Sequence, residues 1–247
     1  MRNRVMVGLV FVLALGVQTV LARTTATNAH TLAEIQDKMY HAKVHKSGQV
    51  TATYANGIAT LAGTVDNVAA KQDAERAARK VDGVKQVVNK IQVFADDLTP
   101  RQMVEQARKQ VVTYYAYGIF DNVQLESQGN KLIVSGQVNQ PFKKSDLGNI
   151  LARVRGVATL ENNLEVLPTS TFDDNLRFRV ARAIYGSDAL FTYGNRAVPP
   201  IHIIVKNGNV TLEGAVGSKM DRQMAEFAAR NAGLSFSVTN NLRVEKA

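Results

Sequence analysis

The chain has 247 residues, and its 30 lysines and arginines against 21 aspartates and glutamates give a formal net charge of +9 at pH 7. It contains four histidines and no cysteine. Thiol nucleophiles and disulfide frameworks are therefore excluded, and acid–base catalysis has few candidate side chains. The positive charge favours anionic partners such as acidic phospholipids or, in other compartments, nucleic acid.

The first 22 residues predict a secretory signal peptide. Arg2 and Arg4 form a charged start, residues 5–17 are apolar, and Ala22 is a small residue before the expected cut. The apolar run of 13 residues is too short for a comfortable transmembrane helix. We expect an exported, periplasmic chain that is soluble or peripherally membrane-associated, with no transmembrane span after processing. Cleavage would leave a net charge of +7, and export argues against nucleic acid as a partner.

One nine-residue pattern occurs three times, at residues 57–65, 130–138 and 208–216. Its central glycines are 73 and 78 residues apart, and its apolar residues alternate with small or polar ones. Alternation of this kind predicts a half-buried strand. Because the pattern recurs at a long period, it indicates three copies of one small supersecondary unit.

The similarity between the copies extends into a helix and a closing strand. Apolar residues at i, i+3, i+4 and i+7 predict the helix: Ala74, Ala77, Ala78 and Val81; Leu147, Ile150, Leu151 and Val154; Ala225, Ala228, Ala229 and Ala232. The closing strands are predicted at residues 89–93, 162–166 and 240–244. Each copy is also expected to start with a helix, whose capping signals are Thr31 with Glu34, Thr99 with Pro100 and Gln102, and Thr171 or Asp173. The order is helix, strand, strand, helix, strand.

Glycines recur at matching places in the copies. Gly63, Gly136 and Gly214 interrupt strands, where glycine costs roughly 0.5–1 kcal/mol relative to alanine. Their recurrence predicts a structural role: close approach of the second helix to the sheet, or a bulge. Gly83 and Gly156 are expected to cap the ends of the second helices. No copy contains the glycine spacing of a phosphate-binding loop.

The chain resembles the BON domain family of bacterial envelope modules. The resemblance is carried by the Gly-x-apolar-x-apolar-x-Gly-x-Val strand, the junctions at residues 81–84 and 154–157, and the Asn-x-apolar-x-Val closing strand. It implies an α+β fold with three tandem domains at residues 31–94, 99–167 and 171–245. Each would be a small three-stranded mixed sheet packed against two helices. The third copy departs by an inserted segment, residues 197–200, and by one extra residue near Gly233.

A basic and aromatic segment of the second copy is a candidate membrane or partner surface. Cationic side chains precede amphipathic aromatic ones there, as in membrane-interface segments. Core packing of Val104, Ala107 and Val111, extended by Tyr114 or Tyr115, explains part of the pattern. The candidate surface residues are Arg101, Arg108, Lys109, Tyr114, Tyr115, Tyr117 and Phe120.

The remaining titratable residues give little sign of chemistry. Asp37, His41 and His45 recur every four residues, which is a metal-site spacing, but a polar outer face near a helix end is the preferred interpretation. His202 is expected on a strand facing polar surroundings. We therefore predict no catalytic residue, no metal and no cofactor.

The resemblance implies a non-catalytic periplasmic binding protein, similar to osmotically inducible BON proteins. Such domains are associated with phospholipid binding, envelope integrity and osmotic stress. The expected partner is anionic phospholipid or another envelope component. The alternative is a periplasmic chaperone or assembly adaptor that binds proteins through sheet edges or grooves between repeats.

Overall fold

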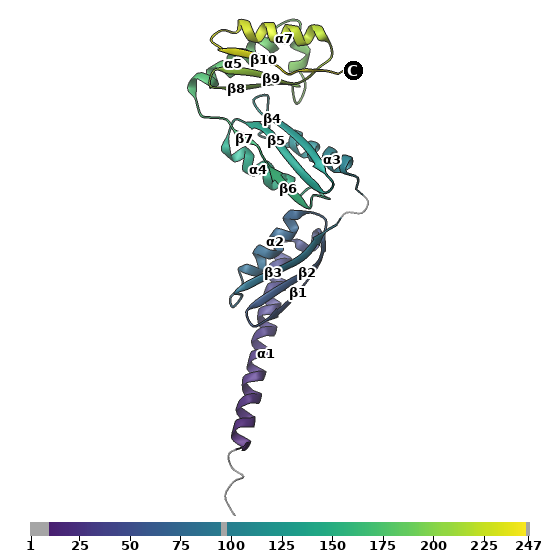
Figure 1. Ribbon diagram of the computed structural model, residues 1–247, viewed down its shortest axis with the longest axis vertical. Coiled ribbons are helices and arrows are strands. Elements are labelled where there is room, and N and C mark those ends of the chain that lie inside the picture. Colours follow the sequence, from purple (N-terminus) through teal and green to yellow (C-terminus); the bar gives the residue numbers. More distant parts are fainter. Residues whose placement is uncertain (1–9, 95–97, 246–247) are drawn as a thin grey trace, which may run out of the picture. The chain divides into compact units, whose positions relative to one another are not determined.

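The computed structural model describes residues 10–94 and 98–245, and only the backbone of residues 10–25 (Figure 1). The chain divides into two compact units, residues 1–96 and 97–247. The first unit holds one sheet with its helices, here called the first module. The second unit holds two further sheets with their helices, the second and third modules.

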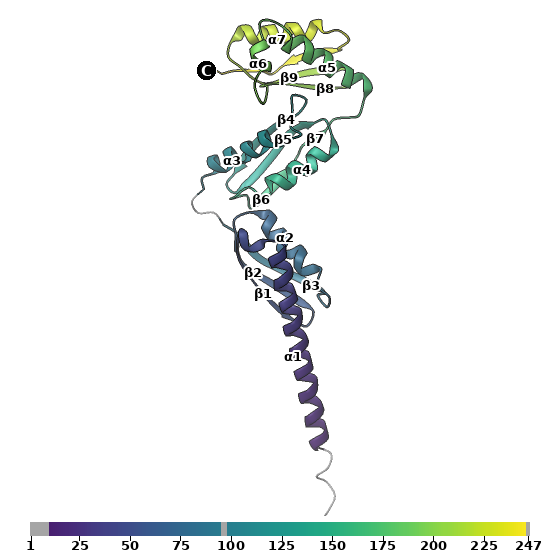
Figure 2. The same ribbon diagram turned by 180° about the vertical axis from the view of Figure 1, so that it is seen from behind.

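The first module has the predicted element order. Its elements are α1 (Val10–His41), the short 3-10 helix η1 (Val44–Lys46), β1 (Gly48–Ala55), β2 (Ile58–Val65), α2 (Val68–Arg79) and β3 (Gln86–Val93). The strands are ordered β1-β2-β3, with β1 antiparallel and β3 parallel to the central β2. Both helices cover the same face of the sheet (Figures 1 and 2). The predicted stripe of α2 is buried there with Ile35 and Met39 of α1.

The first helix differs from its prediction. It does not begin at Thr31, which is buried inside the longer α1. Of the predicted signal peptide, residues 1–9 lie outside the described residues and residues 10–22 belong to α1. Within the part of the chain that the structure describes, no helix combines the length and apolar character needed to cross a membrane.

The second module contains α3 (Pro100–Thr113), β4 (Asn122–Gln128), β5 (Lys131–Val138), α4 (Pro141–Leu151), β6 (Thr159–Asn162) and β7 (Glu165–Val166). The start of α3 is as predicted, because Thr99 and Gln102 form a reciprocal capping box and Pro100 occupies the first turn. The central strand β5 pairs antiparallel with β4 and parallel with β6 and β7.

The third module contains α5 (Thr171–Tyr185), α6 (Phe191–Gly194), β8 (Ile201–Lys206), β9 (Asn209–Val216), α7 (Lys219–Asn231), β10 (Ser237–Asn240) and β11 (Arg243–Val244). The cap of α5 is Ser170, whose hydroxyl accepts from the Asp173 amide, and not Thr171 or Asp173. Asp173 instead accepts hydrogen bonds from the Asn207 and Gly208 amides, both 2.8 Å long. The short α6 was not predicted. With its three mixed sheets, the chain has the predicted α+β fold of three tandem modules.

The repeated strand glycines meet a neighbouring strand. Gly63, Gly136 and Gly214 have φ of 129°, 107° and 108°, a backbone conformation that side chains disfavour. A Cβ on Gly136 would lie 2.1 Å from the carbonyl oxygen of Asn122, and Gly63 and Gly214 have an equivalent clash with the edge strand or the residue before it. The close approach is therefore between strand backbones. Neither expected reason holds, because the helix is not what the glycine meets and the strands pair residue for residue through each glycine without a bulge.

The junction glycines are not helix caps. The helix α2 ends at Arg79 and α4 at Leu151, several residues before Gly83 and Gly156. These glycines have φ of 87° and 88°, and the Val84 and Val157 amides donate back to the carbonyls three residues earlier. Each glycine thus occupies the third position of a tight four-residue turn, where a positive φ favours glycine.

Candidate functional site

The basic and aromatic segment of the second module consists of a helix followed by a loop. The helix α3 ends at Thr113, so residues 114–121 form a loop. Tyr114 is buried, and its hydroxyl donates a 2.7 Å hydrogen bond to Asp146 on α4. Tyr115 is 86% exposed. The two neighbouring tyrosines therefore have different roles, because only Tyr115 is available to a partner.

The loop is held by the buried carboxylate of Asp121. It accepts hydrogen bonds from the amides of Gly118 (3.0 Å) and Asn139 (3.1 Å). The ammonium of Lys143 lies 2.7 Å from the same carboxylate, and both side chains are at most 9% exposed. A buried carboxylate needs a cationic partner and hydrogen-bond donors to offset its lost hydration, and Asp121 has both. Asp121 therefore fixes the loop against α4.

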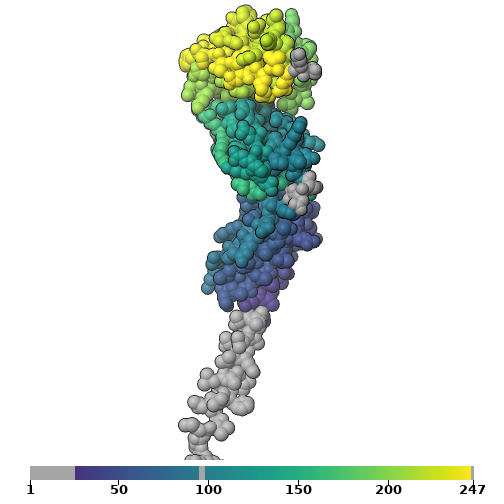
Figure 3. All heavy atoms as spheres, turned by 45° about the vertical axis from the view of Figure 1, so that its right-hand side comes forward, coloured from purple at the N-terminus to yellow at the C-terminus, as the bar shows by residue number. Residues whose placement is uncertain are grey.

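The tip of this loop contacts the third module. The Ile203 amide of the edge strand β8 donates a 2.7 Å hydrogen bond to the carbonyl oxygen of Ile119. The ring of Phe120 packs edge-on against Phe178 of α5, with centroids 5.4 Å apart. Ile119 and Phe120 both pack against the core of the third module. The side chains of the two modules meet in the space-filling view (Figure 3).

A buried histidine lies in the same contact. His202 on β8 is 9% exposed, and its ring lies 5.5 Å from that of Tyr117. Burial lowers the pKa of His202 below 6.5, although backbone hydrogen bonds and the charge of Asp121 oppose that shift. Burial also raises the pKa of Tyr117 to about 12. The expectation of polar surroundings for His202 is therefore wrong. Its side chain is buried in the contact between the second and third modules.

The exposed part of the segment is a stripe on α3 together with Tyr115 in the loop after it. Arg108 and Val112 are exposed at an interval of four residues, which places them on one side of α3, and Tyr115 is exposed two residues beyond the helix end. Arg101 and Lys109 are also exposed. Tyr114, Tyr117 and Phe120 do not join this surface, because packing within the second unit uses them. The candidate membrane surface is thus smaller than the sequence predicted.

A groove between two helices recurs in all three modules. In the first it lies between α1 and α2, has a volume of about 340 Å³ and is lined by Lys38, Arg76 and Lys80, with one carboxylate, Asp73, 3.1 Å from Arg76. In the second it lies between α3 and the end of α4, measures about 280 Å³ and is lined by Arg153 and Arg155. In the third it lies beside α5, measures about 560 Å³ and is lined by Arg179 and Arg182. All of these cationic side chains are exposed.

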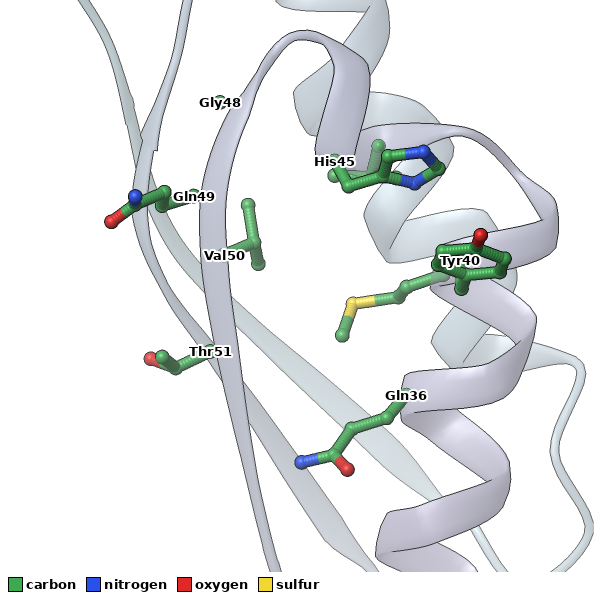
Figure 4. A pocket seen from close by; sticks show the side chains of 9 residues that line it. Gln36, Tyr40, His45, Gly48, Gln49, Val50 and Thr51 are labelled. Carbon is green, nitrogen blue, oxygen red and sulfur yellow. The ribbon is translucent and has the colours of Figure 1, made fainter.

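The first module has a further pocket at the edge of its sheet. This pocket, of about 410 Å³, lies between the end of α1 and the edge strand β1. Val50 points into it from β1, while Gln36 and Tyr40 approach from α1 (Figure 4), and Met39 also lines it. The ring of His45 stacks on that of Tyr40 with centroids 4.5 Å apart. The pocket is therefore apolar at its base and polar at its rim.

The spaced residues Asp37, His41 and His45 do not share one helix. The helix α1 ends at His41, and His45 belongs to η1. His41 lies 3.5 Å from Asp37, whereas His45 contacts Tyr40. Among residues 10–94 and 98–245, no group of three or more His, Cys, Asp or Glu side chains is arranged to hold a metal ion.

Sequence reasoning missed the cationic grooves and the contact between modules. A signal for the grooves exists, because Arg76 precedes the apolar position Ala77 and Lys80 lies three residues after it, and Arg153 and Arg155 flank Val154. The contact between modules has no such signal, since an apolar residue in a loop has the same composition whether it faces a membrane or a neighbouring module.

Comparisons with known proteins give a family. No curated protein matches the chain. The C-terminal domain of CdsD, a type III secretion structural protein of Chlamydia trachomatis, is 14% identical over 85% of this chain and 96% of its own, with a TM-score of 0.25. The periplasmic domain of the inner-membrane secretion protein PrgH from S. typhimurium is 12% identical over 81% of this chain and 94% of its own, with a TM-score of 0.21. The BON domain model matches residues 27–94, 118–168 and 173–246, most of the sequence, and the chain therefore belongs to the BON domain family.

Proposed function

We propose that the chain is a non-catalytic binding protein of the bacterial envelope that associates peripherally with anionic phospholipid. The observation that carries the proposal is the cationic groove between helices, which recurs in all three modules. Phosphate groups bind lysine and arginine through charge-assisted hydrogen bonds. A repeated groove of this kind suits a surface that presents many copies of one anionic group.

The composition and the exposed stripe on α3 support the same function. Each lysine or arginine near an anionic membrane contributes about 1 kcal/mol, so several grooves together provide substantial adhesion. Arg108, Val112 and Tyr115 combine a cation with side chains suited to the membrane interface. Export through the predicted signal peptide would place the chain beside such a surface, where envelope integrity and osmotic stress are the relevant processes.

Vesicle co-sedimentation tests the proposal. The purified chain should sediment with vesicles of phosphatidylglycerol and phosphatidylcholine at low salt, less with phosphatidylcholine alone, and progressively less as salt screens the attraction. Absence of sedimentation with the anionic vesicles at low salt would overturn the phospholipid function.

A second candidate function is an assembly adaptor or chaperone that binds polypeptides. It is favoured by one observation, the backbone hydrogen bond from Ile203 at a sheet edge to the loop residue Ile119. This contact is a short version of strand addition, a common way for proteins to bind extended peptides. If vesicle binding is absent while the chain keeps unfolded proteins from aggregating, this function replaces the first.

A further inference from the structure

The sheet edge and first helix of the third module already bind a polypeptide segment, the loop 117–121 of the second module. The bound segment presents one backbone carbonyl, from Ile119, to the edge strand β8. It also presents an aliphatic and an aromatic side chain to the module's core and to Phe178 of α5. The third module thus shows how a module of this chain binds an apolar segment.

The first module has the same edge in the same register. Ile203 of β8 is opposite Leu212, two residues before Gly214, and Ala52 of β1 is opposite Leu61, two residues before Gly63. Ala52 therefore holds the position of Ile203. Because antiparallel pairing alternates inward and outward amides along a strand, the Ala52 amide is directed outward like that of Ile203. The edge of β1 therefore offers the same donor.

Beside this edge lies the pocket of about 410 Å³ that Figure 4 shows. This pocket is formed by the edge strand β1 and the first helix α1. In the third module, Ile119 and Phe120 occupy the corresponding place, beside the edge strand β8 and the first helix α5. Met39 and Val50 form the apolar base of the pocket, and Tyr40 is 63% exposed at its rim. A large aliphatic or aromatic side chain would remove this apolar surface from water.

Two lysines lie beside the pocket. Lys43 and Lys46 follow α1 directly and are exposed, on either side of His45, which lines the pocket. Complementary charge at a rim favours a segment that carries an acidic residue.

We infer that the edge of β1 and its adjoining pocket bind an extended polypeptide segment with an aliphatic–aromatic pair followed by an acidic residue. The segment adds to β1 through the Ala52 amide and places its apolar pair over Met39 and Val50. The inference rests on the second candidate function and names its site and the chemistry of its partner. It is independent of phospholipid binding, because the cationic grooves use other residues.

The test uses a fluorescent peptide, Tyr-Gly-Ile-Phe-Asp-Asn, which copies residues 117–122, and the purified full chain. Anisotropy should show saturable binding, and NMR should place the largest amide shifts on residues 50–52. Val50→Lys should weaken binding about tenfold or more, because it puts a charge in the apolar base. Thr53→Lys is the matched control, since it adds the same charge to β1 at an exposed residue outside the pocket and should change binding less than about twofold.

A second peptide keeps the test independent of the folding of the variants. Replacing the Ile-Phe pair by Ser-Ser should abolish binding to the unmodified chain. Absence of saturable binding, equal loss in the two lysine variants, or amide shifts confined to β8 would overturn the inference. A chain that fails these tests but still suppresses aggregation of an unfolded protein would retain the second candidate function and lose only this site.

Discussion

The amide of Ile203 donates a 2.7 Å hydrogen bond to the carbonyl oxygen of Ile119, and this bond joins the edge of one sheet to a loop of the preceding module. Edge strands expose unpaired backbone groups, which invite association with other chains. Here the loop covers part of β8 and also buries apolar side chains. Protection of the edge and cohesion of the second unit therefore depend on the same few residues.

We expect Phe120→Ala to destabilise the contact between the second and third modules by about 1–2 kcal/mol, less than for a fully buried phenylalanine, because Phe120 is partly exposed. Urea denaturation of the full chain measures the loss. Tyr115→Ala is the control, because Tyr115 is 86% exposed and its truncation should change stability by less than about 0.5 kcal/mol. Equal effects of the two substitutions would contradict the assignment of Phe120 to the contact.

We expect Gly136→Ala to cost on the order of 3 kcal/mol or more, because the new Cβ would lie 2.1 Å from the Asn122 oxygen at a φ of 107°. Gly129→Ala is the matched control in the adjoining turn. It also has a positive φ, of 59°, but its Cβ would meet nothing within 4 Å, so the expected cost is about 1 kcal/mol. Chemical denaturation compares the two, and similar midpoints would refute a steric role for the repeated glycine.

We expect Asp121→Ala to cost about 3–5 kcal/mol, because it leaves the Lys143 ammonium buried without its partner. Glu226→Ala removes a comparable pair with Arg230 from the surface, where the side chains are 35% and 57% exposed, and should cost less than about 1 kcal/mol. Thermal unfolding distinguishes them. If Asp121→Ala were as mild as Glu226→Ala, the carboxylate would not be what holds the loop.

The pKa of His202 predicts a dependence of stability on pH. Its folded-state pKa lies below the unfolded value of about 6.5, so the unfolded chain binds the proton more tightly. Stability is therefore greatest above pH 6.5, falls as the pH drops below that value, and levels off below the folded-state pKa. His202→Gln should flatten this part of the profile. An identical profile for wild type and His202→Gln would exclude His202 as the source.

Local patterns in the sequence predicted most of the fold. The apolar stripe with Ala74, Ala77 and Ala78 is buried, and the capping box at Thr99 forms, because both depend on residues only a few positions apart. From the sequence pattern alone, a recurring asparagine only marks the start of each closing strand. Its structural role depends on distant partners: Asn89, Asn162 and Asn240 donate to a carbonyl of the preceding helix and accept from the amide two residues ahead.

The candidate site was less predictable, because the same aromatic side chain can face a membrane or pack against a neighbouring module. Tyr114, Tyr117 and Phe120 are residue types typical of a membrane interface. In the structure they instead contact Asp146, His202 and Phe178, respectively. No periodicity in a loop specifies which neighbour it meets. The sequence therefore predicted an aromatic surface of which only Tyr115 is fully available.

Two of the cationic surfaces of the second unit, the groove beside α5 and the stripe on α3, can be distinguished on vesicles. If the groove beside α5 binds phosphate groups, Arg179→Gln with Arg182→Gln should weaken sedimentation with anionic vesicles and reduce its salt dependence, because two contacts near the surface contribute about 1 kcal/mol each. Arg108→Gln with Lys109→Gln removes the same charge from the exposed face of α3. A larger loss in the second variant would assign binding to the α3 stripe. Equal, small losses in both would show that net charge, and not either surface, governs the association.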